Sequence, residues 1–539
     1  MDRGGIVKQS PKRTGEFRPF GLPVQKENKL MTTGIQLNLQ LQEFITAVNN
    51  QPKPLIIPLC AEMPLQDISP LDVYMSTRTG CGFLLESMDG SEKLARYSFI
   101  GIDPEFLISI KDTVDLRGNE PFVSIARDPE GKDPVEKIKS ILSRFHYMNV
   151  KAPRFFGGMV GYFAYDCVYS LFEKVREGKT PSSKNGKDVP DACFMFTKDC
   201  IVVDHRDRKL YIFSSPFLTY DTDAEGEYNT CMERIRVLGD HINALVAGKK
   251  PRYVPGTVPS GSIPFLSQVS QESFEGAVSK VKEHIVAGDI FQAVLSRRMQ
   301  CSISSDPFAV YAALRKINPS PYMYYLDFGD EKIIGASPEM LVRVEKRRVT
   351  TVPIAGTCPR GKNPAEDEQF AQDLLGDAKE RAEHTMLVDL ARNDLGRVCR
   401  FGSVEVSEFM NIEKFSHVQH IVSTVNGTLM DNLDCYDAFR SCFPAGTVSG
   451  APKIRAMQII DEQESSPRGL YAGAVGYIGF DRNLDFAIAI RTVIVHSGTA
   501  YVQVGAGIVA DSVPVNEWKE TENKAAAMIR AIEQSGVCS

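Results

Sequence analysis

The stretch LDFAIAIRTVIV, residues 484–495, alternates small or charged side chains with bulky apolar ones. In an extended strand, Arg491 shares a face with Ala487 and Ala489, and Phe486 points the other way. The small neighbours leave room for a ligand beneath the guanidinium, which can hold a carboxylate through two hydrogen bonds. The stretch therefore predicts a strand with an anion-binding arginine, although an ordinary exposed strand face fits the same pattern.

Other short strands precede this stretch, and helices become longer after residue 270. Turn residues bound four strand-like runs: GFLLES (82–87), YSFIGI (97–102), DCIVVDH (199–205) and KLYIFSS (209–215). Residues 270–288 place apolar side chains on one helical face, with Ser270 or Ser273 as the N-cap and Gly288 just past the end. The run DIFQAVLSRRM (289–299) alternates like a strand.

The length of 539 residues predicts more than one region. Residues 1–30 carry seven Lys/Arg against three Asp/Glu and little periodicity, which predicts a disordered extension; a transit peptide is the weaker alternative. Loop-like composition at 176–191 and 247–264 suggests a boundary at the second loop. We therefore expect a β-rich N-terminal regulatory region over 31–250 and a catalytic domain over 265–535.

Composition narrows the class of partner. The net charge is −6 and the basic residues are spread along the chain, so nothing indicates a nucleic-acid surface. No run of apolar residues is long enough to span a membrane. The 12 cysteines form no C-x-x-C pair, which favours reduced thiols and a cytoplasmic location.

Two helical segments each present a pair of carboxylates. Glu380 and Glu383 lie three residues apart in the helix-like segment 368–394. Glu517 and Glu520 repeat the spacing near the C-terminus, followed by Lys524 on the same face and preceded by Pro514 near the helix start. If the two helices meet across a pocket, their oxygens suit a hard cation such as Mg²⁺; separately, they read as solvated helix faces.

Several further residues are candidates for ligand binding or proton transfer. The turn in FPAGTVSGAPKIRAMQII (443–460) leads into a helix beginning near Pro452 and suits a carboxylate or phosphate, unless it is a plain capping turn. Gly505 and Gly507 end a strand where backbone amides can approach an anion. His420 and Glu339 are candidate proton-transfer groups, although a buried histidine is more often structural.

Together these segments resemble the chorismate-utilising enzymes, and among them the large subunits of anthranilate synthases. The resemblance runs from about Pro54 to the C-terminus. Its motifs are GDIFQAVLSRR (288–298), GASPEML (335–341), PIAGTCPRG (353–361), ERAEHTMLVDLARNDLGRV (380–398), PAGTVSGAPKIRAM (444–457), YAGAVGYIG (471–479) and WKETENKA (518–525). The family implies an α+β fold: an antiparallel β-sandwich core with helices packed on the outside, interleaved with a smaller N-terminal portion.

The resemblance also implies a role for each site residue. Glu383 and Glu520 would bind Mg²⁺, with Glu380 and Glu517 beside them. The enolpyruvyl carboxylate of chorismate would be held by Tyr471, Arg491, Gly505 and Gly507, with Lys524 and Thr447 nearby, and the PIAGT motif contributes Gly356 and Thr357. Glu339 would protonate the departing C4 hydroxyl, and His420 would assist the elimination that follows.

Two positions favour one reaction of the family over others. Related aminodeoxychorismate synthases typically carry a nucleophilic lysine where this chain has Ala355. Isochorismate and salicylate synthases place a water-activating lysine at the position of Gln292. We therefore expect ammonia to attack chorismate directly and yield anthranilate and pyruvate. The alternatives are an aminodeoxychorismate synthase and an inactive regulator that binds an aromatic amino acid.

Partners follow from the same resemblance. No Gly-x-Cys-x-Gly nucleophile turn is present, so a separate glutamine amidotransferase subunit is expected to supply ammonia, in a heterotetramer of two synthase and two glutaminase subunits. Three motifs match the family's tryptophan inhibitor pocket and supply Leu84, Glu86, Ser87, Arg96, Pro321, Tyr322 and Met323. Feedback inhibition by tryptophan, within tryptophan biosynthesis, is therefore expected.

Overall fold

The computed structural model describes residues 37–49, 51–88, 96–176, 189–248, 263–415 and 418–535. The expected extension over residues 1–30 lies outside the described residues, as does most of the two expected loops. Within the described ranges, no helix is both long and apolar enough to cross a bilayer.

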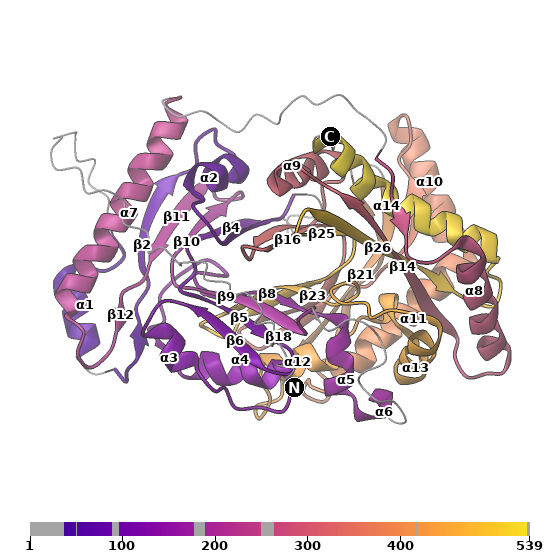
Figure 1. The fold of residues 1–539 in the computed structure, drawn as a ribbon, viewed down its shortest axis with the longest axis horizontal. Coiled ribbons are helices and arrows are strands. Elements are labelled where there is room, and N and C mark those ends of the chain that lie inside the picture. The colour runs from indigo at the N-terminus through magenta and orange to yellow at the C-terminus, as the bar shows by residue number, and fades with distance from the viewer. Residues whose placement is uncertain are drawn as a thin grey trace, which may run out of the picture.

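Two large antiparallel sheets form the body of the described structure (Figure 1). The first has twelve strands in the order β13 (Leu266–Ser267), β14 (Gln292–Ser302), β26 (Thr499–Ile508), β25 (Thr492–His496), β16 (Glu331–Ser337), β15 (Tyr322–Asp327), β3 (Gly82–Glu86), β4 (Tyr97–Ile102), β10 (Cys200–Asp204), β11 (Lys209–Ser214) and β2 (Leu59–Pro64), with β22 (Gly450–Ala451) paired to β14. The second has eleven strands in the order β19 (Ile354–Pro359), β21 (Val418–Thr428), β18 (Arg348–Thr351), β17 (Met340–Glu345), β24 (Leu484–Ile488), β23 (Ala474–Gly479), β8 (Gly158–Phe163), β9 (Ala192–Thr197), β5 (Phe106–Ile110) and β6 (Val114–Gly118), with β20 (Glu405–Lys414) paired to β21. A third, small sheet joins β12 (Phe217–Leu218), β1 (Leu55–Ile56) and β7 (His146–Tyr147).

Each large sheet contains one block of strands from before residue 250 and one block from after residue 265. β3 pairs with β15 in the first sheet, and β8 pairs with β23 in the second. The two sequence ranges therefore share their hydrogen-bonded framework.

The apolar residues of the first sheet serve two cores because successive side chains point to opposite faces. Phe83 and Tyr324 pack in a core that also contains residues of the second sheet, such as Phe486. Their chain neighbours Leu84 and Tyr325 pack in another core, beneath the helices. The expected α+β fold, a sandwich of antiparallel sheets with helices outside, is confirmed.

Helices cover the outer faces of the sandwich. In Figure 1, α9 and α14 lie along one side of the sheets and α3, α4 and α12 along the other. The helices are α1 (Leu41–Val48), α2 (Pro70–Thr77), α3 (Phe122–Ala126), α4 (Pro134–Ser143), α5 (Val168–Leu171), α6 (Glu173–Arg176), α7 (Ala224–Val246), α8 (Gln271–Val286), α9 (Pro307–Ile317), α10 (Pro364–Gly376), α11 (Ala378–Gly396), α12 (Cys435–Cys442), α13 (Lys453–Gln463) and α14 (Pro514–Ser535). The expected starts of α8 and α13 are confirmed: Ser270 caps α8 by accepting from Ser273 N, and α13 begins directly after Pro452.

Two expected continuous elements are broken in the structure. The segment 368–394 was expected as one helix but contains the end of α10 and most of α11, because the Asp377 carboxylate accepts hydrogen bonds from Lys379 N and Glu380 N and starts a new helix. The expected single strand over 484–495 is also wrong. It divides into β24 and β25, which belong to different sheets, and Arg491 lies between them with φ of 51°.

The close pairing of β8 with its neighbours predicts a stability effect at Gly161. A Cβ at this position would lie 2.0 Å from the Cys193 carbonyl oxygen of β9, so Gly161→Ala must push two central strands apart. We expect a loss of roughly 1–3 kcal/mol in the free energy of unfolding, measured by urea denaturation. The control is Gly276→Ala in α8, where a Cβ meets no atom within 4 Å. That variant should gain up to about 1 kcal/mol, and equal midpoints for the two variants would contradict the prediction.

Candidate active site

Two segments that pass from one large sheet to the other carry the central charged side chains. One joins β16 to β17 and contains Glu339, and the other joins β24 to β25 and contains Arg491. Ile488 N donates to Glu339 O at 3.0 Å, and Ala336 N donates to Arg491 O at 3.1 Å. The two crossing segments therefore fix each other's positions. In Figure 1, α8, α11, α13 and α14 surround this end of the sheets.

Glu339 is suited to donate a proton near neutral pH. The Thr447 hydroxyl, in the short 3₁₀ helix Gly446–Val448, donates to Glu339 Oε1 at 2.8 Å. Burial raises the pKa of the Glu339 carboxyl to about 7, although Thr447 and the Lys524 ammonium act in the opposite direction. A carboxyl with this pKa is partly protonated at neutral pH and can act as a general acid.

His420, on β21, is held in one tautomer by β19. Its Nδ1 lies 2.9 Å from Gly356 O and 3.1 Å from Thr357 Oγ1. Because a carbonyl oxygen only accepts, Nδ1 carries the proton, and Nε2 of the neutral ring is free to accept one. Burial and the Arg491 charge lower the pKa of His420, which favours this neutral form.

Tyr471, Gly505 and Lys524 form a compact polar patch. A Cβ at position 505 would lie 2.5 Å from the Tyr471 hydroxyl, so the hydroxyl needs glycine there. Lys524 Nζ donates to Gly505 O at 3.0 Å and pairs with Glu520 Oε1 at 2.6 Å. Beside this patch, the Gln292 amide nitrogen would be 2.9 Å from a Cβ at position 507. The patch thus brings hydroxyl, ammonium and amide donors to one strand end.

Arg491 is a cation with hydrogen-bond capacity to spare. Burial lowers the pKa of its guanidinium, which nevertheless stays charged at neutral pH. Within the described residues, no carboxylate forms an ion pair with Arg491, whereas Arg343 and Arg468 each have one. A buried guanidinium without a protein anion is suited to bind the carboxylate of a ligand.

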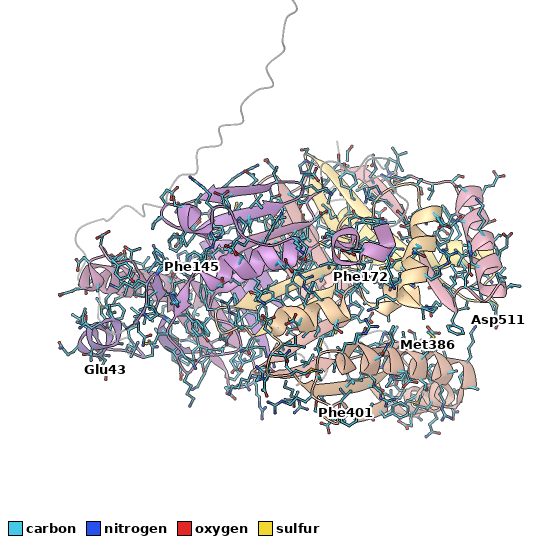
Figure 2. All side chains as sticks on the ribbon, turned by 90° about the horizontal axis from the view of Figure 1, so that it is seen from below. Glu43, Phe145, Phe172, Met386, Phe401 and Asp511 are labelled. Atoms are coloured by element: carbon cyan, nitrogen blue, oxygen red, sulfur yellow. The ribbon has the colours of Figure 1, made fainter. Side chains whose placement is uncertain are left out.

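The helices that carry the two carboxylate pairs, α11 and α14, lie at the same end of the molecule (Figure 1). Figure 2 places Met386 of α11 and Asp511, just before α14, at this end. The Lys379 charge on α11 acts on Glu517 and partly offsets the rise in its pKa. Burial and then repulsion from Glu383 raise the pKa of Glu380, while burial raises that of Glu517, with a contribution from Glu520.

These carboxylates fit a hard cation but do not form a finished ligand set. Glu517 Oε2 is buried and has no hydrogen-bond partner within the part of the chain that the structure describes. Within that part, no three carboxylate, histidine or cysteine side chains are close enough together to hold a metal ion. The four predicted ligands therefore contribute oxygens to one region without converging on one point.

A separate cavity of about 50 Å³ lies between the two large sheets. Ser87, Pro321, Tyr322 and Met323 line it, as predicted for an inhibitor pocket, and Ser87 Oγ donates to Pro321 O at 2.7 Å. Additional lining comes from Tyr97, Phe99, Arg154, Arg343, Val475, Tyr477 and Asp485. These residues come from strands far apart in the chain, so no local spacing in the sequence indicates them.

The structure places two predicted pocket residues, Arg96 and Leu84, away from the cavity, and pairs the charge of a third, Glu86. Arg96 pairs with Asp204 and Asp207 at 2.7 and 2.8 Å and does not line the cavity. Leu84 points into the core beneath the helices. Glu86 does line the cavity, but its carboxylate accepts hydrogen bonds from the Tyr311 hydroxyl and from Arg315. The charges of Arg96 and Glu86 are therefore paired with other residues of the protein.

Comparison with known proteins agrees with this geometry. Anthranilate synthase component 1 of Acetivibrio thermocellus is 44% identical over 89% of this chain and 96% of the relative, and that of Aquifex aeolicus is 44% identical over 93% and 98%.

Solved structures extend the comparison. Anthranilate synthase component I of Streptococcus pneumoniae superposes with a TM-score of 0.66 at 36% identity, covering 87% of this chain and 99% of that one. MenF, the menaquinone-specific isochorismate synthase of Escherichia coli, shares the fold with a TM-score of 0.66 at 17% identity, over 91% and 98% of the chains. A model of the chorismate binding enzymes matches residues 82–530. The chain therefore belongs to the chorismate binding enzyme family.

Proposed function

We propose that the chain is the synthase subunit of anthranilate synthase, which converts chorismate and ammonia to anthranilate and pyruvate in the first step of tryptophan biosynthesis. The observation that carries the proposal is the chemistry of Gln292 and Ala355. Gln292 lies against Gly507, and Ala355, near the start of β19, pairs with Ile421 of β21. An amide and a methyl group supply neither a base for water nor a nucleophilic amine, and ammonia needs neither.

The unpaired cation at Arg491 supports a carboxylate-bearing substrate. In the proposal, Arg491 and the Tyr471 hydroxyl hold the enolpyruvyl carboxylate, with the backbone of Gly505 and Gly507 beneath it. Lys524 adds positive charge while it stays anchored to Gly505 O. Gly356 and Thr357 contact the substrate from β19 and orient His420.

The proton transfers follow from the two titratable groups. Glu339 donates its proton to the C4 hydroxyl as the C4–O bond breaks and ammonia adds at C2, and water leaves. Thr447 keeps the carboxyl aligned. His420, with Nδ1 held by Gly356 O, accepts the C2 proton on Nε2 as pyruvate departs and the ring becomes aromatic.

Mg²⁺ is part of the proposal, with Glu383 and Glu520 as its ligands and Glu380 and Glu517 beside them. The bound ion would hold the ring carboxylate and stabilise negative charge on the leaving oxygen. Support comes from the unpartnered Glu517 Oε2 and from the mutual repulsion within each carboxylate pair.

Partners and control complete the proposal. The relatives carry the name component 1, which supports a second component, a glutamine amidotransferase that supplies ammonia within a two-plus-two heterotetramer. The cavity beside Ser87 and Met323 supports tryptophan as a feedback inhibitor. A cytoplasmic location is supported by the cysteines, since all those within the described ranges are free thiols.

A fluorescence assay tests the reaction. The purified chain, given chorismate, Mg²⁺ and an ammonium salt at alkaline pH, should form anthranilate and an equal amount of pyruvate without any partner, and EDTA should abolish both. An aminated product without pyruvate would instead assign an aminodeoxychorismate synthase. Glu520→Gln should raise the Mg²⁺ concentration needed for half-maximal rate, whereas Asp389→Asn, on an exposed part of α11, should not.

Tryptophan control predicts a variant that is active but insensitive. Ser87→Leu fills part of the cavity, so the tryptophan concentration for half-inhibition should rise by at least about tenfold, a loss of about 1.4 kcal/mol in binding. The rate without tryptophan should change little, because Ser87 lies outside the active site. The exposed Ser143→Leu serves as the control, and equal inhibition of both variants would show that tryptophan binds elsewhere.

The raised pKa of Glu339 predicts a pH-dependent stability difference. An unfolded chain titrates this carboxyl near pH 4.5 and the folded chain at about 7. Between these values the unfolded state binds fewer protons, so the contribution of Glu339 to stability falls as pH rises. Glu339→Gln removes this loss, and its free energy of unfolding relative to wild type should increase by up to about 3 kcal/mol from pH 4.5 to 8.

The same variant should lose at least about a hundredfold in the rate of anthranilate formation, because the general acid is gone. Urea denaturation at several pH values measures the stability part, with the exposed Glu405→Gln as control. A difference that does not vary with pH would mean that Glu339 is ionised in the folded protein at neutral pH.

A further inference from the structure

A cavity of about 50 Å³ lies beside Glu339, outside the polar patch that faces the substrate. Its walls are mostly apolar side chains of β17, the segment after β18, α11 and the segment before α13: Leu341, Val352, Leu387, Leu390, Ala391 and Ala445. Four polar residues interrupt this lining, namely Glu339, Thr351, Asp394 and Thr447. The cavity therefore connects the proposed general acid with two polar groups that the mechanism above does not use.

Both additional polar groups have unused hydrogen-bond capacity. Thr351 is 6% exposed and Asp394 is 5% exposed. Within the described residues, neither Thr351 Oγ1 nor Asp394 Oδ1 has a hydrogen-bond partner. A buried polar atom left without a partner costs about 1–3 kcal/mol, and bound water commonly removes this cost where a polar cavity has room for it.

The other oxygen of Asp394 is firmly held. Lys453 Nζ, at the start of α13, donates to Asp394 Oδ2 at 3.1 Å, and both side chains are about nine-tenths buried. Burial raises the pKa of Asp394, while Lys453 and Arg397, which lies just after α11, act in the opposite direction. Cys442 on α12 also lines the cavity, and burial raises the pKa of its thiol and keeps the thiol neutral.

The proposed reaction needs a proton supply to Glu339. Each turnover leaves this residue as a buried carboxylate that must be protonated again. The direct neighbours are already occupied: Thr447 donates its hydroxyl proton to Glu339 Oε1, and the Lys524 ammonium donates to Gly505 O and Glu520. A path for protons through the cavity would allow the Glu339 carboxylate to be protonated again.

We propose that water in this cavity links Thr351 and Asp394 to Glu339 and that Asp394 returns protons to Glu339 through it. The inference rests on the proposed function for the step that consumes the proton. Asp394 is a positioning residue here, since it acts through water and Glu339 and does not touch the substrate. Lys453 keeps its charge and holds Asp394 in place.

The proton count balances within one turnover. The Glu339 proton joins the departing C4 hydroxyl and leaves as water when the C4–O bond breaks. The C2 proton that His420 accepts is matched by the proton that the methylene carbon of the departing enolpyruvyl group takes up to become pyruvate. Ammonia forms the C2–N bond with its lone pair, and the resulting ammonium group releases one proton to solvent as it becomes an amine. One proton from solvent passes over Asp394 Oδ1 and the cavity water to the Glu339 carboxylate, so no other reactant is required.

Thr351→Val gives the sharpest test because it removes only an unpartnered hydroxyl and keeps the shape of the side chain. The matched control is Thr350→Val on the same strand, whose hydroxyl donates to Asn426 instead. With chorismate and an ammonium salt, we expect kcat of Thr351→Val to fall by about tenfold, less than on loss of the acid itself, with KM for chorismate unchanged. The solvent deuterium isotope effect on kcat should increase, and Thr350→Val should show neither change.

Asp394→Asn should behave like Thr351→Val, and its kcat should recover as the concentration of a small buffer acid such as imidazolium rises. If that variant does not fold, because Lys453 is left as an unpaired buried cation, Asp394→Asn combined with Lys453→Met replaces it. Wild-type kcat and isotope effect in Thr351→Val would overturn the proposal. So would a fall in kcat with a raised KM and no response to buffer, which indicates a structural role.

An infrared measurement separates this inference from the proposed function. The carbonyl stretch of protonated Glu339, assigned by its loss in Glu339→Gln, exchanges in D₂O without any turnover. We expect exchange about tenfold slower in Thr351→Val than in wild type and in Thr350→Val. If wild type makes no anthranilate but the exchange is slowed, the proposed reaction fails and the proton route stands; unchanged exchange overturns the route in either case.

Discussion

The site depends on one constraint: two chain segments pass from one sheet to the other and are joined by backbone hydrogen bonds. Ile488 N donates to Glu339 O, and Ala336 N donates to Arg491 O. A strand that stays within one sheet presents its side chains only to that sheet's two faces. A segment that leaves one sheet for another turns its side chains toward the gap between them. Backbone hydrogen bonds thereby fix the segments that carry the acid Glu339 and the cation Arg491 next to each other.

The elements with clear local signals could be predicted from the sequence. Ser270 begins α8 and Pro452 immediately precedes α13, because capping and proline preferences act over a few residues. The break between β24 and β25 could not be predicted in this way. Apolar residues on both sides of Arg491 are buried in either sheet, so their alternation looks the same whether the strand continues or bends.

The site residues were predicted one by one, and their roles came from the order of several motifs along the chain. The lining of the inter-sheet cavity could not be predicted from such motifs. Tyr97, Arg154 and Tyr477 meet there from three separate parts of the chain, and each looks like an ordinary strand or loop residue in its own surroundings. The network in which Arg343 and Tyr322 both bond Asp485 has the same character, since it depends on sheet order and not on spacing.

The mixing of early and late strands within each sheet has a consequence for synthesis on the ribosome. β8 finds its partner β23, and β3 its partner β15, only after much of the intervening chain has been made. Until then, the apolar strands β8 and β3 each have one open edge, and open edges of this kind readily pair with other chains. The nascent protein is therefore most prone to aggregation before the partner strands in its second half have been made. This tendency ends only near the end of translation, when β23 can pair with β8.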